Sequence, residues 1–438
     1  MTPVTQALLD KVRDAGLLEA ESGEPVHVLL ARPADLVVAN GTAAEPLVRL
    51  ETQLLIHHAE EVVLGLKLAM QATGAKKGAV AVKRSDREAV RALERAINTD
   101  GFAKFHVQIH ALPSIYPASD ALTLTPLLEA DPAGTLILNA MTLFQVAGAH
   151  RGQRLTRRLV TVTGAVREPK TLWAPLGASF ETLIAAAGGA AFEGPAALLV
   201  GGPMRGRLAD GFAGQVTHTT TNLALLPQDH VLVRLRRIPH RFALRRAQST
   251  CHACRRCTDL CPVYQAGGAL EPHRVMRALH VPFEAPVPVF AATLECTNCQ
   301  LCTLYACPSE LSPAGLIQEV KAAQSSLGTS VLPRPARSPG LRAAWRVPLA
   351  RLAKHLGLYG LDYVAPLDAG EIRVRRIELA LAQGPEVMLH PAVRLGDRVS
   401  MGQLVARPAP DSPAVPLYAG IAGVVKSLGE TLVIEEIG

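Results

Sequence analysis

The spacing of apolar residues in the first third of the chain alternates between a helical and a strand period. Residues 54–72 place apolar side chains three and four positions apart, and Gly74 follows where a helix commonly ends. The apolar run "GAVAVK" predicts a strand, and Ser85 and Glu88 have the spacing of a capping box ahead of the helical pattern "REAVRALERAI". Because strands alternate with helices, residues 1–157 are predicted to form an α/β domain with a largely parallel sheet.

The pattern changes after this domain. Residues 158–232 show an alternating strand, a turn, a second strand and a short helix that ends at paired glycines, which predicts a compact α+β unit. Residues 233–331 contain the helical pattern "EPHRVMRAL". Residues 332–370 begin with the proline- and arginine-rich "LPRPARSPG" and are predicted to be a linker. Residues 371–438 consist of short strand patterns separated by Gly and Pro, which predicts a small all-β sandwich.

Composition narrows the class of protein. The 438 residues are 49% hydrophobic and 19% charged, which excludes a mostly disordered chain and suggests about three domains. No apolar run approaches the roughly 20 residues that span a bilayer, so no transmembrane segment is expected. The N-terminus also lacks the pattern of a signal peptide. We therefore expect a cytoplasmic protein, and in that compartment cysteines serve as metal ligands more often than as disulfides.

The net charge of +7 is concentrated in one region. Six arginines lie from Arg234 to Arg246, and Arg255 and Arg256 follow. This cluster is either a solvated face or a docking surface for an anionic partner or a phosphate-bearing cofactor. A nucleic-acid partner is not expected, because aromatic residues make up only 4% of the chain and no aromatic series alternates with the arginines to stack bases.

All eight cysteines lie in two short runs, "CHACRRCTDLCP" and "CTNCQLCTLYACP". In each run three cysteines are separated by two residues, and a fourth precedes a proline. Three such thiolates can hold one face of an iron–sulfur cubane, while the fourth reaches the other cluster. We therefore predict two [4Fe-4S] clusters, one held by Cys251, Cys254, Cys257 and Cys307 and the other by Cys296, Cys299, Cys302 and Cys261. The alternative is a pair of zinc sites, which usually present cysteines as separated pairs.

Three stretches carry a family resemblance: the four-residue gap in "LCTLYACP", the segment "PHRVMRAL", and "RVPLARLAKHLGLYGLDYVAPL". In these the chain resembles the cobalamin reductases of propanediol-utilising bacterial microcompartments, which are similar to the C subunit of the Rnf electron-transport complex and to the flavoprotein subunit of respiratory complex I. The resemblance implies a multidomain α/β protein. Its parts would be a complex-I-flavoprotein-like domain (1–157), a soluble-ligand-binding β-grasp (SLBB) domain (158–232), a helical dicluster ferredoxin module (233–331) and a C-terminal barrel-sandwich hybrid domain (371–438).

The resemblance is weakest at the nucleotide loop. The family's glycine-rich loop, typically GAGGAGFPTHVKL, lets the backbone approach FMN and NADH closely. Here the matching stretch is "EAESGEPVHVLL", with carboxylates at Glu19, Glu21 and Glu24, and the family's acidic segment is reduced to "NGTAAEP". The remnant of an FMN and NADH site would comprise Gly23, Pro25, His27, Asn40 and Glu45. We predict that the fold persists while NADH binding is lost and FMN binding is impaired.

These observations predict an iron–sulfur electron-transfer protein without an NADH site of its own. It would relay single electrons from a separate flavoprotein or reductase to a corrinoid or a corrinoid enzyme. The resemblance places it inside a microcompartment, with the shell as a further partner. Two alternatives stay open: a complete NADH- and FMN-dependent cobalamin reductase, and a scaffold protein whose clusters are structural. The pattern identifies no catalytic residue, so whether the chain is itself an enzyme stays open.

Overall fold

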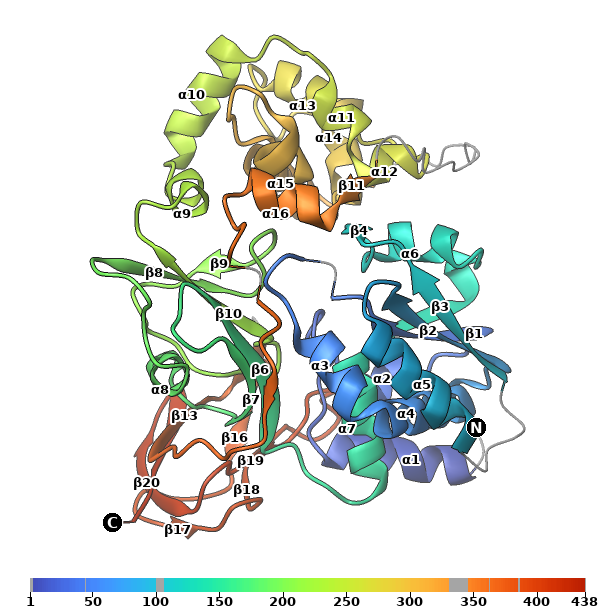
Figure 1. Ribbon diagram of the computed structural model, residues 1–438, viewed down its shortest axis with the longest axis vertical. Coiled ribbons are helices and arrows are strands. Elements are labelled where there is room, and N and C mark those ends of the chain that lie inside the picture. Colours follow the sequence, from blue (N-terminus) through green and yellow to red (C-terminus); the bar gives the residue numbers. More distant parts are fainter. Residues whose placement is uncertain are drawn as a thin grey trace.

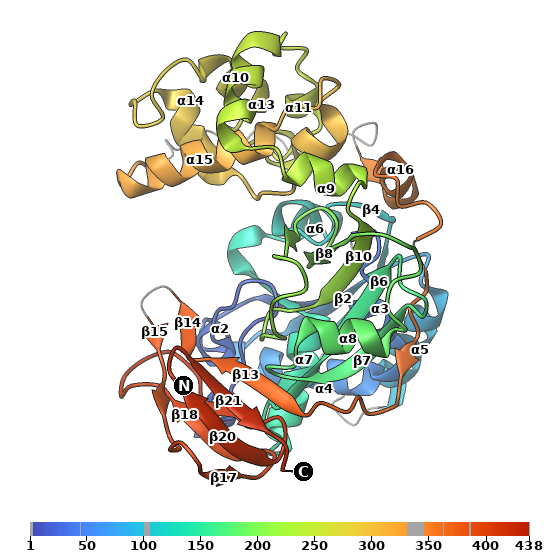
Figure 2. The same cartoon turned by 90° about the vertical axis from the view of Figure 1, so that its left-hand side faces the viewer.

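The computed structural model describes residues 3–43, 45–99, 106–330, 346–361, 363–384 and 387–437. A helical module lies at one end of the molecule, above an α/β domain and a β-grasp domain that stand side by side (Figures 1 and 2). A small β domain packs at the opposite end, beneath the β-grasp domain. A continuous apolar core connects the first helices, the β-grasp sheet and this small β domain. Among the described residues, no helix is long and apolar enough to cross a membrane.

The N-terminal domain confirms the predicted parallel α/β architecture. Its four-stranded sheet has the order β3-β2-β1-β5, and all neighbours are parallel. The strands are β1 (Leu36–Gly41), β2 (Lys77–Lys83), β3 (His106–Leu112) and β5 (Thr135–Asn139). The helices are α1 (Pro3–Asp14), α2 (Val26–Leu30), α3 (Leu50–His57), α4 (Ala59–Thr73), α5 (Arg87–Thr99), α6 (Ala121–Leu127), η1 (Pro132–Gly134) and α7 (Ala140–His150). The carboxyl ends of β1 and β5 point toward the β-grasp domain, which places ligand-accessible loops there.

Two local predictions in this domain were wrong. The single helix expected over residues 54–72 is broken at His58, whose backbone leaves the helical region (φ −135°, ψ 32°). The apolar period continues across the break because α3 and α4 share one core. The capping box is also absent: the Ser85 hydroxyl contacts Asp86 and Ser114 instead of the helix backbone. The stop at Gly74 is confirmed by its left-handed conformation (φ 79°).

The β-grasp domain follows the predicted order of strand, turn, strand and short helix. Its six-stranded sheet has the order β12-β7-β6-β10-β8-β9. These elements are β6 (Arg157–Gly164), β7 (Lys170–Pro175), α8 (Phe180–Ala186), β8 (Ala196–Val200), β9 (Arg207–Leu208), β10 (Asn222–Pro227) and β12 (Leu367–Asp368). The last strand is unexpected, because it comes from the segment that was predicted to be a linker.

The second half of that predicted linker is structured. Strand β11 (Val347–Pro348) pairs with β4 (Ile115–Tyr116), and the short helix α16 (Leu349–His355) follows it. Strand β12 then joins the edge of the β-grasp sheet. Apolar residues such as Leu352 and Leu358 are fully buried, so this segment packs against three parts of the chain instead of connecting them loosely. The "LPRPARSPG" stretch lies outside the described residues.

The helical module and the C-terminal β domain agree with their predictions. The module consists of α9 (Val231–Arg236), α10 (His240–Thr250), α11 (Arg256–Asp259), α12 (Pro262–Gln265), α13 (Pro272–Ala278), α14 (Pro288–Ala291), η2 (Ala292–Glu295), η3 (Cys302–Ala306) and α15 (Pro313–Ser326). The "EPHRVMRAL" pattern forms α13. The C-terminal strands are β13 (Arg376–Ala380), β14 (Ala382–Gly384), β15 (Val387–Met388), β16 (His390–Pro391), β17 (Arg398–Val399), β18 (Leu404–Arg407), β19 (Leu417–Tyr418), β20 (Gly423–Leu428) and β21 (Thr431–Glu435). They form two antiparallel sheets, β13-β21-β20-β17 and β16-β18-β19, beside a short β14-β15 pair.

Candidate functional site

Each cysteine run folds with the same backbone kinks. In the first run Ala253 and Arg255 have positive φ angles (52° and 70°), and in the second run Asn298 and Gln300 do (56° and 63°). The kinks therefore fall at matching positions, two and four residues after the first cysteine. Alternation of right- and left-handed residues turns successive backbone N–H groups toward one concavity, an arrangement found around bound anions and iron–sulfur clusters. The two runs are structural repeats of one another.

The eight thiols surround two separate hollows. One hollow is lined by Cys251, Cys254, Cys257 and Cys307. The other is lined by Cys261, Cys296, Cys299 and Cys302. These are the two sets that the spacing predicts, and each takes its fourth member from the other run. Throughout the part of the chain that the structure describes, no group of three or more His, Cys, Asp or Glu side chains is placed to hold a single metal ion. The zinc and iron–sulfur alternatives therefore both stay predictions.

The two hollows differ in their access to solvent. Cys254 is exposed, whereas Cys261, Cys299 and Cys302 are buried. Burial raises the pKa of Cys257, Cys261 and Cys299 to about 12. A thiol with such a pKa becomes a thiolate ligand only when a bound metal supplies the compensating positive charge. Cluster ligation by these residues stays a prediction. Of the two predicted clusters, the one in the first hollow would lie nearer the surface.

The buried hollow contacts the N-terminal domain through Tyr116. The Tyr116 hydroxyl, on β4, donates a hydrogen bond of 2.7 Å to the backbone carbonyl of Cys299. Tyr116 is only 2% exposed, and burial raises its pKa well above the ordinary value. The phenol is therefore a neutral donor that anchors the second cysteine run against the α/β domain.

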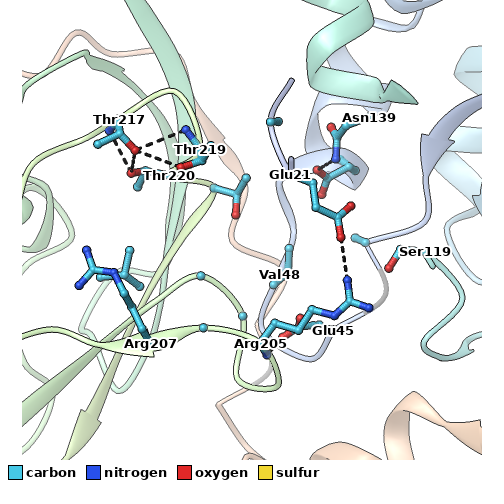
Figure 3. A pocket seen from close by; sticks show the side chains of 18 of the residues that line it. Glu21, Glu45, Val48, Ser119, Asn139, Arg205, Arg207, Thr217, Thr219 and Thr220 are labelled. Atoms are coloured by element: carbon cyan, nitrogen blue, oxygen red, sulfur yellow. Dashed lines mark hydrogen bonds and ion pairs between the residues drawn. The ribbon is translucent and has the colours of Figure 1, made fainter. Parts of the chain in front are cut away.

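A cavity of about 420 Å³ lies between the α/β domain and the β-grasp domain (Figure 3). One wall is formed by the carboxyl ends of β1 and β5, which present Asn40 and Asn139. The opposite wall is formed by the glycine-rich turn after β8 and by a threonine-rich loop, residues 217–221. A side chain at Gly202 would collide with the Glu45 carboxylate and would displace it from its present position. This is the position at which ligands bind in open parallel sheets.

Carboxylate side chains of the protein itself accept hydrogen bonds from backbone amides at this cavity. Buried Glu19 accepts hydrogen bonds from the backbone N–H groups of Glu21 and Ser22, both at 2.7 Å. On the opposite wall, Glu45 accepts from the N–H groups of Met204 and Arg205, at 2.8 and 3.4 Å. A phosphate would need such amides to be free. The residues present therefore do not fit a phosphate-bearing nucleotide at either position.

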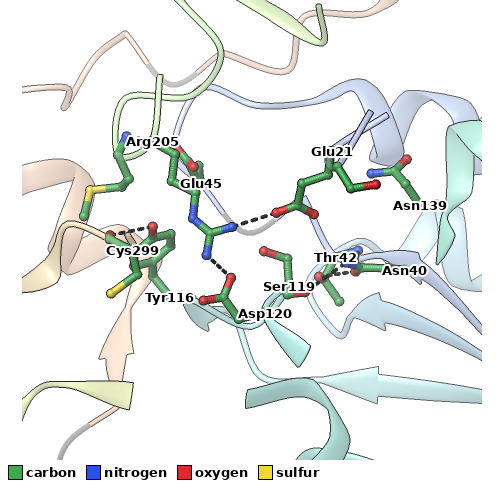
Figure 4. Close-up of polar contacts among 12 residues, drawn as sticks. Glu21, Asn40, Thr42, Glu45, Tyr116, Ser119, Asp120, Asn139, Arg205 and Cys299 are labelled. Carbon is green, nitrogen blue, oxygen red and sulfur yellow. Dashed lines mark hydrogen bonds and ion pairs between the residues drawn. The ribbon is translucent and has the colours of Figure 1, made fainter. Parts of the chain in front are cut away.

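Arg205 is the central charge of the cavity (Figure 4). Its guanidinium donates to Glu21 at 2.7 Å and also to Asp120, whose side chain is 4% exposed. Burial raises the pKa of Glu21 and of Glu45, and the Arg205 charge opposes the rise in both. Sequence reasoning missed Arg205, because its stretch showed only a glycine-rich turn and nothing local indicates its distant partners.

The structure brings only part of the predicted nucleotide-site remnant together. Asn40 and Glu45 line the cavity. The cavity is not lined by Gly23, Pro25 or His27. Gly23 adopts a left-handed turn (φ 72°), and Pro25 directly precedes α2. His27 lies on α2, and its Nδ1 atom is buried. The Asn40 side chain already has partners within the protein. Its amide nitrogen donates a hydrogen bond to the carbonyl of Ser119, and its amide oxygen accepts one from the backbone N–H of Thr42.

Substitution of Glu19 should open an anion site in the cavity. We expect Glu19→Ala to tighten FMN binding at least about tenfold, because two amides are freed and charge-assisted hydrogen bonds contribute about 1.5–3 kcal/mol each. The measurement is quenching of flavin fluorescence on titration with protein. Glu24→Ala is the matched control, since Glu24 has the same charge but is exposed and pairs with Arg32. Equal gains in both variants would mean that only net charge matters and would contradict this role of Glu19.

Comparison with known proteins gives three family matches, two relatives that match over nearly the whole chain and others that match over part of it. Residues 12–146 match the Nuo51 FMN-binding domain, residues 159–208 the SLBB domain and residues 250–312 the 4Fe-4S dicluster domain. The chain is 34% identical to the cobalamin reductase PduS of Salmonella typhimurium, over 96% of this chain and 94% of that protein. It is 32% identical to the cobalamin reductase PduS of Citrobacter freundii, over 97% and 95%. A more distant relative is a component of the Na⁺-translocating ferredoxin:NAD⁺ oxidoreductase complex of Acetobacterium woodii, which is 31% identical over 55% of this chain and 54% of that protein.

Proposed function

The chain belongs to the family of the cobalamin reductase PduS, and on that premise we propose that it passes single electrons from a separate flavoprotein or reductase to a corrinoid or a corrinoid enzyme. Its family matches support an iron–sulfur and flavin type of electron-transfer oxidoreductase. The finer proposal is that two [4Fe-4S] clusters carry the electrons and that the chain does not oxidise NADH itself. Enclosure in a microcompartment, with contact to its shell, is part of the same proposal.

The observation that carries the proposal is the arrangement of the two cysteine hollows between the protein surface and the N-terminal domain. The first cysteine hollow reaches the surface at Cys254, and the second is buried. The second hollow is joined to the interdomain region by the bond between Tyr116 and Cys299. When bound, each cluster would supply one-electron chemistry. The chain's own part is to hold the two sites next to each other, to exclude water from the second, and to fix its backbone against strand β4 of the N-terminal domain.

A second candidate is the complete NADH- and FMN-dependent cobalamin reductase. The match of residues 12–146 to an FMN-binding domain favours it. The carboxylates of Glu19 and Glu45 count against it, because both occupy amides that a nucleotide phosphate would need. The cavity retains the position of a nucleotide site while its charges oppose one.

The deciding experiment is anaerobic purification with iron and sulfide reconstitution, followed by flavin extraction and reduction by NADH or dithionite. We expect that no flavin is extracted. We also expect dithionite, but not NADH, to reduce the clusters, with reduction monitored by visible absorbance and low-temperature EPR. Co-purified flavin with bleaching by NADH would overturn the proposal in favour of the complete reductase. Clusters that dithionite cannot reduce would point instead to a structural role.

A further inference from the structure

The segment that leads into the first cysteine site is exceptionally basic. Between Asp229 and Asp259 the chain contains eight arginines and no Asp or Glu. Part of this charge is used inside the protein. Arg236 donates to the carbonyls of Pro203 and Met204, and Arg246 donates to the carbonyl of Ser309. Arg255 forms an ion pair with Asp259 at 3.0 Å.

Part of the remaining charge lies on the exposed face of helix α10. Helix α10 buries Ala243 and Ala247 against the module and turns Arg241, Phe242 and Arg245 to solvent. Within the described residues, no hydrogen bond or ion pair engages the guanidinium of Arg241 or Arg245. Phe242 is 53% exposed between them, an unusual position for a large apolar side chain. We call Arg241, Phe242 and Arg245 the arginine face.

The arginine face lies on the helix that leads directly to the one point where a cysteine site reaches the surface. Helix α10 ends at Thr250, and Cys251 of the first hollow follows directly. Cys254 is the only exposed cysteine of the eight, and it lies two residues before Arg256. An electron can pass between two proteins only where a redox centre comes close to the surface, so a recognition surface here would lie where it is needed.

We propose that the arginine face docks an acidic electron-carrier protein beside Cys254. This inference rests on the proposed function and names the partner for one of its two ends. Arginine and aromatic residues dominate the energetic centres of protein interfaces, and Phe242 offers an apolar contact beside two exposed positive charges. Complementary charge also speeds encounter, which suits a carrier that must bind and leave quickly. A single exposed aromatic side chain offers no series of stacking platforms for nucleic acid.

The test uses the reconstituted full-length protein and an oxidised, acidic [2Fe-2S] ferredoxin as the probe, with binding measured by calorimetry. At about 50 mM salt we expect saturable binding that weakens strongly at about 300 mM, because salt screens exposed charges. The double variant Arg241→Glu, Arg245→Glu should weaken binding at low salt by at least about tenfold. The matched control is Arg394→Glu, Arg398→Glu, which makes the same charge change at exposed positions of the C-terminal domain. The control should stay within about twofold of the unchanged protein.

The readouts separate this inference from the proposed function. Unchanged dithionite-reduced EPR spectra in the double variant would show that the clusters are intact and that only docking is lost. Equal weakening in both double variants, or no binding of the ferredoxin to the unchanged protein at low salt, would overturn the docking proposal. Tighter binding of a DNA duplex or of anionic lipid vesicles than of the ferredoxin would also overturn it. None of these outcomes would alter the test with NADH and dithionite.

Discussion

Replacing Cys307 by alanine will remove the same cluster as replacing Cys254, although Cys307 belongs to the other cysteine run. The two thiols line one hollow, and the proline-preceding cysteine of each run reaches across to the other set. Each substitution should lower bound iron from about eight to about four atoms per chain after reconstitution. Iron analysis and low-temperature EPR of the reduced protein will show whether the surviving cluster is the same in both variants.

The reciprocal pair provides the control. Cys261→Ala and Cys299→Ala should both remove the other cluster, since these thiols line the second hollow. Both thiols are buried, so their loss should also lower thermal stability more than the loss of exposed Cys254 does. If the EPR spectrum of Cys307→Ala matched that of Cys299→Ala instead, the crossed ligation would be wrong and each run would hold its own cluster.

Replacing Arg205 by methionine will destabilise the protein by about 3 kcal/mol, because removal of one partner from a buried ion pair leaves the other charge uncompensated. The side chain of Asp120 is 4% exposed and that of Arg205 is 24% exposed, so the pair is largely shielded from water. Denaturant unfolding of the anaerobic holoprotein measures the loss. Arg207→Met is the control, since Arg207 lines the same cavity but is exposed.

The cost of losing Arg205 should depend on pH. The pKa of Glu45 is raised in the folded protein by burial. The Met204 amide and the Arg205 charge oppose that rise, so the loss of Arg205 raises the pKa further. A carboxyl with a raised folded pKa favours folding while it is protonated, and this contribution is lost as pH rises above the unfolded pKa. The deficit of Arg205→Met should therefore grow from about pH 5 to about pH 7. Equal stability of the Arg205 and Arg207 variants across this range would contradict the central role of Arg205.

The parts of the fold that could be predicted are those that depend on residues close together in the sequence. Apolar periods identified the parallel α/β domain, the β-grasp order and the C-terminal strands, because each period reports which face of one element is buried. The prediction of one helix over residues 54–72 failed at a single position. His58 breaks the helix without interrupting its apolar period, because both halves pack into one core. The predicted linker failed for a different reason. Its short strands gain their hydrogen bonds only by pairing with distant strands β4 and β7.

The two cysteine sets could be predicted from spacing alone, because the three cysteines of each run stand within seven residues and this spacing limits which metal centres they can bind. The charge pattern of the cavity, in contrast, depends on contacts between segments that are distant in the chain. Arg205 lies 184 residues from Glu21 and 85 residues from Asp120, and the amides that Glu45 occupies lie about as far away along the chain. Whether a carboxylate repels a ligand, caps a backbone amide or neutralises an arginine depends on which groups the fold brings within a few ångströms of it. Residue type alone does not carry that information, so Glu21 was visible in the sequence while its partner Arg205 was not.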